Sequence, residues 1–150
     1  MSLPEPSALV PHQGDALLLD CIDAVRPDGL VASLVVRGEQ APGGECRSLP
    51  AWIGPEIMAQ AISAFATYRS GPPYLPKPGL ILGIRKYHSS VTEFKRGTRL
   101  AVSVRESTRD DAGGAVFDST LSLNGAEIAN GMLTVYQPDD IVQTLADQLE

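Results

Sequence analysis

The chain has 150 residues, of which 43% are hydrophobic and 20% are charged, with a formal net charge of −6. These values are typical of one soluble globular domain and exclude a largely disordered chain. The sequence has neither an apolar run long enough to cross a bilayer nor the basic start and apolar block of a secretion signal. We therefore expect a single cytoplasmic domain spanning residues 1–150, with neither a nucleic-acid nor a membrane partner.

The two cysteines and the charge distribution bear on possible ligands. Cys21 and Cys46 lie far apart and lack the spacing of a zinc site or a disulfide framework, so we expect two reduced thiols and no metal. Residues 69–109 contain nine of the twelve Lys and Arg residues but only two carboxylates, Glu93 and Glu106. This basic stretch is either an ordinary solvated face or a docking surface for an acidic partner.

The first half of the chain leads to one long helix. After a proline-rich start, residues 16–25 predict an apolar turn or short strand and residues 30–38 predict a strand, with the turn signal RPDG between them. A loop rich in helix breakers covers residues 39–50. Between Ala51 and Tyr68, apolar residues recur at spacings of one, three and four, which predicts a helix that begins at Pro50 or, with less loss of hydrogen bonding, at Pro55.

The second half of the chain predicts strands. After a loop at 71–79, the strand candidates are residues 79–91, 98–107, 115–123 and 127–136, and two of them alternate apolar with small or polar residues as half-buried antiparallel strands do. One apolar helix followed by an antiparallel meander predicts an α+β domain in which a curved sheet wraps a long central helix. This is the hot-dog fold.

The predicted helix carries a narrow polar stripe. Glu56, Gln60, Ser63 and Thr67 lie at i, i+4, i+7 and i+11 on an otherwise apolar cylinder. The stripe is too thin for a solvent-exposed face, so its members are either satisfied buried polar groups or parts of a site. Glu56 is the strongest candidate for a functional residue, because a buried carboxylate is costly without a partner or a purpose.

Several segments resemble one family in the same order along the chain. GPEIMAQA at 54–61 is similar to the E-x-M-A-Q segment on the central helix of hot-dog 3-hydroxyacyl-carrier-protein dehydratases, where the glutamate is catalytic. LVPHQGDALLLD at 9–20 resembles that family's opening, and FKRGTRLAVSV at 94–104 resembles a later strand entry. Residues 52–60, 79–87 and 132–138 resemble the ApeP type, a small branch encoded with aryl polyene biosynthesis.

Two residues depart from the family pattern, and the first is Asp15, where the opening segment usually has a proline. Dehydratases of the main branch carry a histidine in G-H-F-P, fourteen residues before the glutamate, where this chain has Pro42. The resemblance implies an acid and a base, and Glu56 is the expected acid. Hot-dog active sites form between subunits, so His12 can approach Glu56 of its own or of the partner chain and is then the leading candidate base. His88 is a weaker candidate. We expect Gln60, Trp52 and Tyr87 to contact the substrate, with Trp52 and Tyr87 in the core or lining the acyl channel.

Three functional hypotheses follow from the resemblance. The first is dehydration of a 3-hydroxyacyl group on acyl carrier protein to the trans-2-enoyl thioester, in fatty-acid or polyene-type lipid biosynthesis, without metal or diffusible cofactor. The second is a degenerate, non-catalytic subunit that binds an active dehydratase partner or the carrier protein. The third is an acyl thioesterase. In each case the resemblance implies a homodimer or a heterodimer with another hot-dog protein.

Overall fold

The computed structural model describes residues 2–40, 46–76 and 80–136. Within these ranges the chain forms one long helix, several short helical turns and ten strands. The helical elements are α1 (Pro6–Leu9), η1 (Gly14–Ala16), η2 (Ala51–Ile53) and α2 (Gly54–Arg69). The strands are β1 (Cys21–Arg26), β2 (Gly29–Val35), β3 (Glu39–Gln40), β4 (Cys46–Arg47), β5 (Leu49–Pro50), β6 (Leu80–Ser89), β7 (Glu93–Phe94), β8 (Arg99–Arg109), β9 (Gly114–Leu123) and β10 (Ala126–Tyr136).

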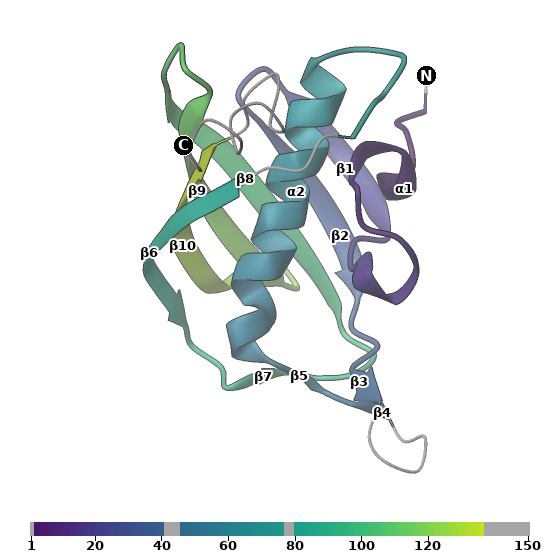
Figure 1. Cartoon of the computed structure of the whole chain (residues 1–150). Coiled ribbons are helices and arrows are strands. Elements are labelled where there is room, and N and C mark those ends of the chain that lie inside the picture. The colour runs from purple at the N-terminus through teal and green to yellow at the C-terminus, as the bar shows by residue number, and fades with distance from the viewer. Residues whose placement is uncertain (1, 41–45, 77–79, 137–150) are drawn as a thin grey trace, which may run out of the picture.

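Six strands build one antiparallel sheet in the order β1-β2-β8-β9-β10-β6. The sheet curves around α2, which crosses its concave face, as Figure 1 shows. The α+β arrangement of a long helix wrapped by an antiparallel sheet, predicted from the sequence, is confirmed. Strand β6, the first long strand after the helix, lies at one edge of the sheet, and among the described strands it pairs only with β10.

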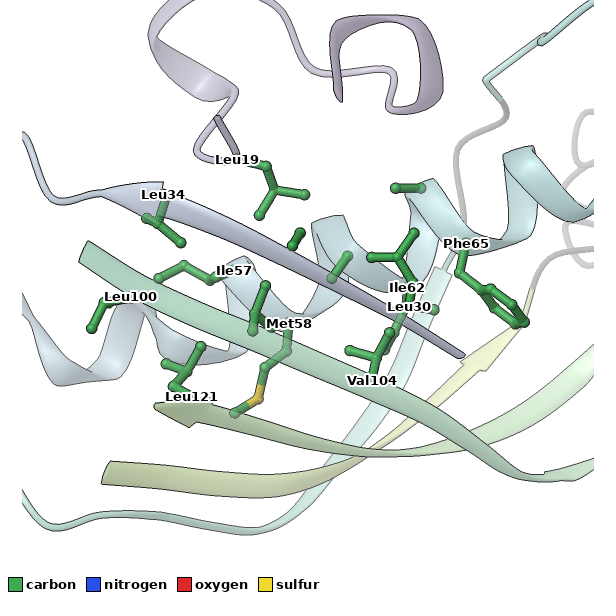
Figure 2. Close-up of a cluster of buried hydrophobic side chains, with 14 of the residues drawn as sticks. Leu19, Leu30, Leu34, Ile57, Met58, Ile62, Phe65, Leu100, Val104 and Leu121 are labelled. Carbon is green, nitrogen blue, oxygen red and sulfur yellow. The ribbon is translucent and has the colours of Figure 1, made fainter. Parts of the chain in front are cut away.

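Helix α2 supplies the centre of the core. Pro55 lies in its first turn, where no backbone donor is lost, so the later of the two predicted starts is correct. Ile57, Met58 and Phe65 are almost fully buried against apolar residues of β2, β8 and β9, as Figure 2 shows. Each such side chain contributes about 1.5–3 kcal/mol of burial free energy, so the position of α2 is fixed along most of its length.

The strand alternation read from the sequence reappears in the burial pattern. Leu100, Val102 and Val104 of β8 point into the core, and their neighbours Ala101 and Ser103 are only partly buried. The four predicted C-terminal strands correspond to β6, β8, β9 and β10. The sequence prediction missed α1, η1 and the two-residue strands β3, β4, β5 and β7, because such short elements carry no periodicity.

Replacing Gly29 by alanine is expected to destabilise the fold by about 1–3 kcal/mol or more. A Cβ atom at this position would lie 2.1 Å from the main-chain oxygen of Val104, where β2 pairs with β8, so one strand would have to move. Urea unfolding followed by circular dichroism measures the loss. Gly83→Ala on β6, whose added Cβ meets nothing within 4 Å, is the matched control and is expected to change little. Equal stability of the two variants would contradict the prediction.

Candidate active site at the start of the central helix

The start of α2 and the N-terminal loop bring two sequence-predicted residues together. Glu56 lies in the first turn of α2, and His12 lies in the loop between α1 and η1. The Nε2 atom of His12 is 3.2 Å from Oε1 of Glu56, and the two side chains are 35% and 42% exposed. The pair therefore sits at the protein surface, within reach of a ligand.

Gln60 fixes the geometry of this pair. Its side chain is fully buried, its Nε2 donates to the carbonyl oxygen of Ala16, and its Oε1 accepts from the backbone N–H of Leu18. Because a carbonyl can only accept and a backbone N–H can only donate, these two partners determine which way the amide points. The same Nε2 donates to Oε1 of Glu56 at 3.1 Å. Gln60 thus fastens the N-terminal loop to α2 and holds the carboxylate.

These contacts distinguish the two carboxylate oxygens of Glu56. Oε1 of Glu56 accepts from Gln60, so an acidic proton on this carboxyl group would have to sit on Oε2, for which the described residues provide no hydrogen-bond partner. Nε2 of His12 lies 3.2 Å from the same oxygen, and Nδ1 of His12 is buried without a hydrogen-bond partner among the described residues. Oε2 of Glu56 is the atom free to exchange a proton.

A groove of about 760 Å³ lies between the N-terminal loop, β2 and the turn before α2. Its lining includes Gly14, two residues after His12, and Ile53, three residues before Glu56. The other lining residues are the aliphatic residues 17–19, Leu34, Val35 and Leu49 together with Gly38 and the charged Asp15, Asp20 and Arg37. The groove thus combines aliphatic and charged side chains.

The two aromatic candidates occupy different environments. Tyr87 of β6 is partly buried and its hydroxyl donates to the carbonyl oxygen of Ala51 at 2.5 Å; burial raises the pKa of this hydroxyl above its ordinary value. Trp52 is 69% exposed, so the expectation that it packs in the core is wrong for this chain. It lies four residues before Glu56, at the surface. His88, the weaker candidate base, is exposed on β6 opposite Asn130.

Of the remaining members of the polar stripe on α2, Thr67 is buried and Ser63 is partly buried. The hydroxyl oxygens of Ser63 and Thr67 have no hydrogen-bond partner among the described residues.

Pro42, at the position of the family histidine, lies outside the described residues, as do residues 77–79 and the end of the closing MLTVYQP segment. Within the described ranges no cluster of three His, Cys, Asp or Glu side chains could hold a metal ion. No helix in those ranges is long and apolar enough to span a membrane.

Solved structures share this architecture. The chain is similar to a protein of the dehydratase heterocomplex ApeI:P from Xenorhabdus doucetiae, with a TM-score of 0.80 and 24% identity over 95% of this chain and 98% of that one. It is also similar to the E. coli PaaI protein of the phenylacetic acid degradation operon, with a TM-score of 0.58 and 11% identity over 78% and 82% of the two chains. These similarities confirm the hot-dog fold.

A third similar structure is described as a thioesterase and not as a dehydratase. It is a hypothetical thioesterase with coenzyme A from Streptococcus pneumoniae TIGR4, with a TM-score of 0.56 and 14% identity over 77% of this chain and 82% of that one. No curated protein matches the sequence. The ApeP-like family model, described as ApeP dehydratase, matches residues 4–146, which is nearly the whole chain. The chain therefore belongs to the ApeP-like dehydratase family.

Proposed function

We propose that this protein dehydrates a 3-hydroxyacyl group, carried as a thioester on acyl carrier protein, to the trans-2-enoyl thioester. The observation that carries the proposal is the carboxylate of Glu56: one oxygen is held by His12 and Gln60, while the other has no partner among the described residues. Membership of a dehydratase family supports the reaction class. The cytoplasmic location expected from the sequence stays a prediction.

The contacts of Glu56 favour different roles from those expected from the sequence, in which Glu56 is the acid and His12 is the base. Oε2 of Glu56 takes the proton from the carbon next to the thioester carbonyl, the double bond forms, and the bond from carbon 3 to its hydroxyl oxygen breaks. Glu56 then gives the proton to that oxygen, which leaves as water, and the carboxylate is restored. Because Nδ1 of His12 is buried and Nε2 faces Oε1 of Glu56, His12 in this scheme donates a hydrogen bond from Nε2 to Oε1 and does not take the substrate proton.

The surroundings of Glu56 suit the rest of the substrate. The positive end of the α2 dipole lies at its first turn, where it favours the negative charge that develops on the thioester oxygen. The aliphatic side chains of the groove that Gly14 and Ile53 help to line offer a surface for the acyl chain. Exposed Trp52 stays a proposed substrate contact, whereas Gln60 and Tyr87 are bonded to the protein itself.

Basic side chains near the same end of α2 support an acidic carrier protein as partner. Exposed Lys95 and Arg96 occupy the turn after β7, and the backbone N–H of Arg96 donates to the Ser48 hydroxyl, shortly before α2. Exposed Arg85 and Lys86 lie on β6, next to Tyr87. Four cations around the helix start would attract an acidic protein and guide its tethered substrate to the site.

A second hot-dog subunit is part of the proposal. The outer edge of β6 has no partner strand among the described residues, and Leu82 and Ile84 on it are 63% and 45% exposed. Long edge strands with exposed apolar side chains favour pairing with another strand. The similar protein from Xenorhabdus doucetiae belongs to a heterocomplex of dehydratases. Pro42, in place of the family histidine, favours the alternative that this chain is a non-catalytic subunit of such a pair.

Product identity separates the three hypotheses. A 3-hydroxyacyl carrier protein is incubated with the purified chain, and the carrier is analysed by intact mass. Loss of one water with the acyl chain still attached is the expected result. Release of the free acid would establish instead that the chain is an acyl thioesterase, the alternative that the similar thioesterase structure suggests. No change in mass on short or long acyl chains would leave the chain as a non-catalytic subunit and contradict the proposal.

A further inference from the structure

Tyr87 owes its orientation to an irregularity in the edge strand. In the ladder between β10 and β6, Asn130 is opposite His88 and Met132 is opposite Arg85, so two residues of β6 face one residue of β10. The extra residue is a β-bulge, and Lys86 within it has a φ of 57°, in the left-handed region that non-glycine residues seldom adopt. Such bulges re-aim side chains, and here the redirected side chain is Tyr87.

Two glycines make room for the Tyr87 ring. A Cβ atom on Gly54 would lie 2.0 Å from the Tyr87 hydroxyl oxygen, and a Cβ atom on Gly131 would lie 3.3 Å from a ring carbon. Gly54 is the first residue of α2 and Gly131 is on β10, opposite the bulge. The ring is therefore enclosed between the sheet and the start of the helix, and any larger residue at position 54 would displace it.

The Tyr87 hydroxyl ends on the turn that leads into α2. It donates to the carbonyl oxygen of Ala51, which also accepts the backbone N–H of Gly54. Glu56 follows Gly54 by two residues, within the same first turn. Among the described residues of the edge strand, Tyr87 is thus the one whose side chain donates a hydrogen bond to the backbone just before Glu56. Burial raises the pKa of its hydroxyl, so the group remains a donor at neutral pH.

We propose that Tyr87 is a positioning residue for Glu56: its hydroxyl, aimed by the bulge in β6, fixes the turn at Ala51–Ile53 and thereby the first turn of α2 that presents the carboxylate. The inference rests on the proposed function of Glu56. It also links the free edge of the sheet to the site, because the residue that sets the start of α2 belongs to the edge strand itself. Small displacements of a reacting group have large effects on rate, so one hydroxyl group matters here.

The test is Tyr87→Phe, which keeps the ring and removes only the hydroxyl. On a 3-hydroxyacyl carrier protein we expect kcat to fall by about 10- to 100-fold while KM changes little. Tyr68→Phe is the matched control, because it removes a hydroxyl from the opposite end of α2, where Tyr68 stacks on Tyr74. It is expected to leave kcat unchanged. An unchanged kcat in Tyr87→Phe would overturn the proposal.

Two spectroscopic readouts test the same inference without turnover. Trp52, the only tryptophan, is adjacent to Ala51, so its fluorescence emission reports on the turn that Tyr87 holds. The chain has two histidines, and the imidazole proton signals of His12 report on its contact with Glu56, with those of exposed His88 as internal reference. Tyr87→Phe should shift the Trp52 emission and the His12 signals, and not those of His88.

These readouts separate failure of the inference from failure of the proposed function. If the wild-type protein does not turn over substrate but the Trp52 and His12 signals shift in Tyr87→Phe, Tyr87 positions the Glu56 turn and the dehydratase assignment alone is wrong. If both signals are the same as in wild type, Tyr87 does not position the turn, whatever the activity of the protein.

Discussion

Glu56→Gln is expected to reduce the rate of dehydration by about 100- to 10,000-fold, the usual contribution of a group that transfers a proton in the transition state. The substitution keeps the shape of the side chain. Because Gln60 donates to Oε1 and Nε2 of His12 lies 3.2 Å from the same oxygen, the new amide oxygen is expected to take that position and its NH₂ group to replace Oε2. The variant then presents a donor where the reaction needs an acceptor. Single-turnover kinetics on a 3-hydroxyacyl carrier protein measures the effect.

A matched control for this variant is Glu127→Gln. Glu127 is an exposed residue of β10 whose carboxylate accepts a hydrogen bond from Asn130, and it lies outside the site. It is expected to react at the wild-type rate. Thermal unfolding of both variants shows whether any loss of activity has a folding cause. Dehydration by Glu56→Gln at the rate of the control would refute the assigned role of Glu56.

Gln60→Leu is expected to lower the free energy of unfolding by about 2–4 kcal/mol. Leucine is apolar and of similar size, so it leaves the backbone N–H of Leu18 and the carbonyl of Ala16 without their partner, and each unsatisfied group costs about 1–3 kcal/mol. Urea unfolding of the variant and wild type gives the difference. The activity of the variant is expected to fall as well, because the N-terminal loop that carries His12 loses its attachment to α2.

Ser63→Ala is the control for Gln60→Leu on the same face of α2. The Ser63 hydroxyl is buried and has no partner among the described residues, so its removal is expected to be neutral or stabilising. Both substitutions remove a polar group from the stripe. We expect Gln60→Leu to lower the free energy of unfolding and Ser63→Ala to raise it or leave it nearly unchanged. A similar loss of stability in both would show that the hydrogen bonds of Gln60 have no special importance.

The fold was largely accessible from the sequence because its main elements are long. The periodic apolar residues of α2 and the alternation in the first half of β8 each extend over several residues and agree with the observed burial. The ladder β5–β7 depends instead on a contact between loops far apart in the sequence, and the ladder β3–β4 has only two residues on each side. Such contacts leave no local pattern, so these strands could not be predicted.

The site was accessible only in part. Glu56 and His12 were identified as candidates from residue type and family resemblance, and the structure brings them to 3.2 Å across 44 positions of sequence. The partners of Gln60 are backbone groups of Ala16 and Leu18, which no residue pattern marks. The orientation of Tyr87 depends on a bulge in β6, and bulges follow from register rather than composition. Of the two expectations for Trp52, the core position was wrong, because an aromatic residue in an apolar segment is usually buried, and the contact with substrate stays a prediction.

The account rests on Glu56 acting through Oε2 while His12 donates to Oε1, and the single-turnover rate of water loss in His12→Gln and His12→Ala tests this most directly. The amide nitrogen of glutamine can take the place of the histidine Nε2 donor but cannot act as a base near neutral pH. We predict that His12→Gln stays within about tenfold of the wild-type rate and that His12→Ala is slower, as expected for loss of a hydrogen bond to a charged group. If both variants are as inactive as Glu56→Gln, then His12 itself accepts the substrate proton and the assigned roles are wrong.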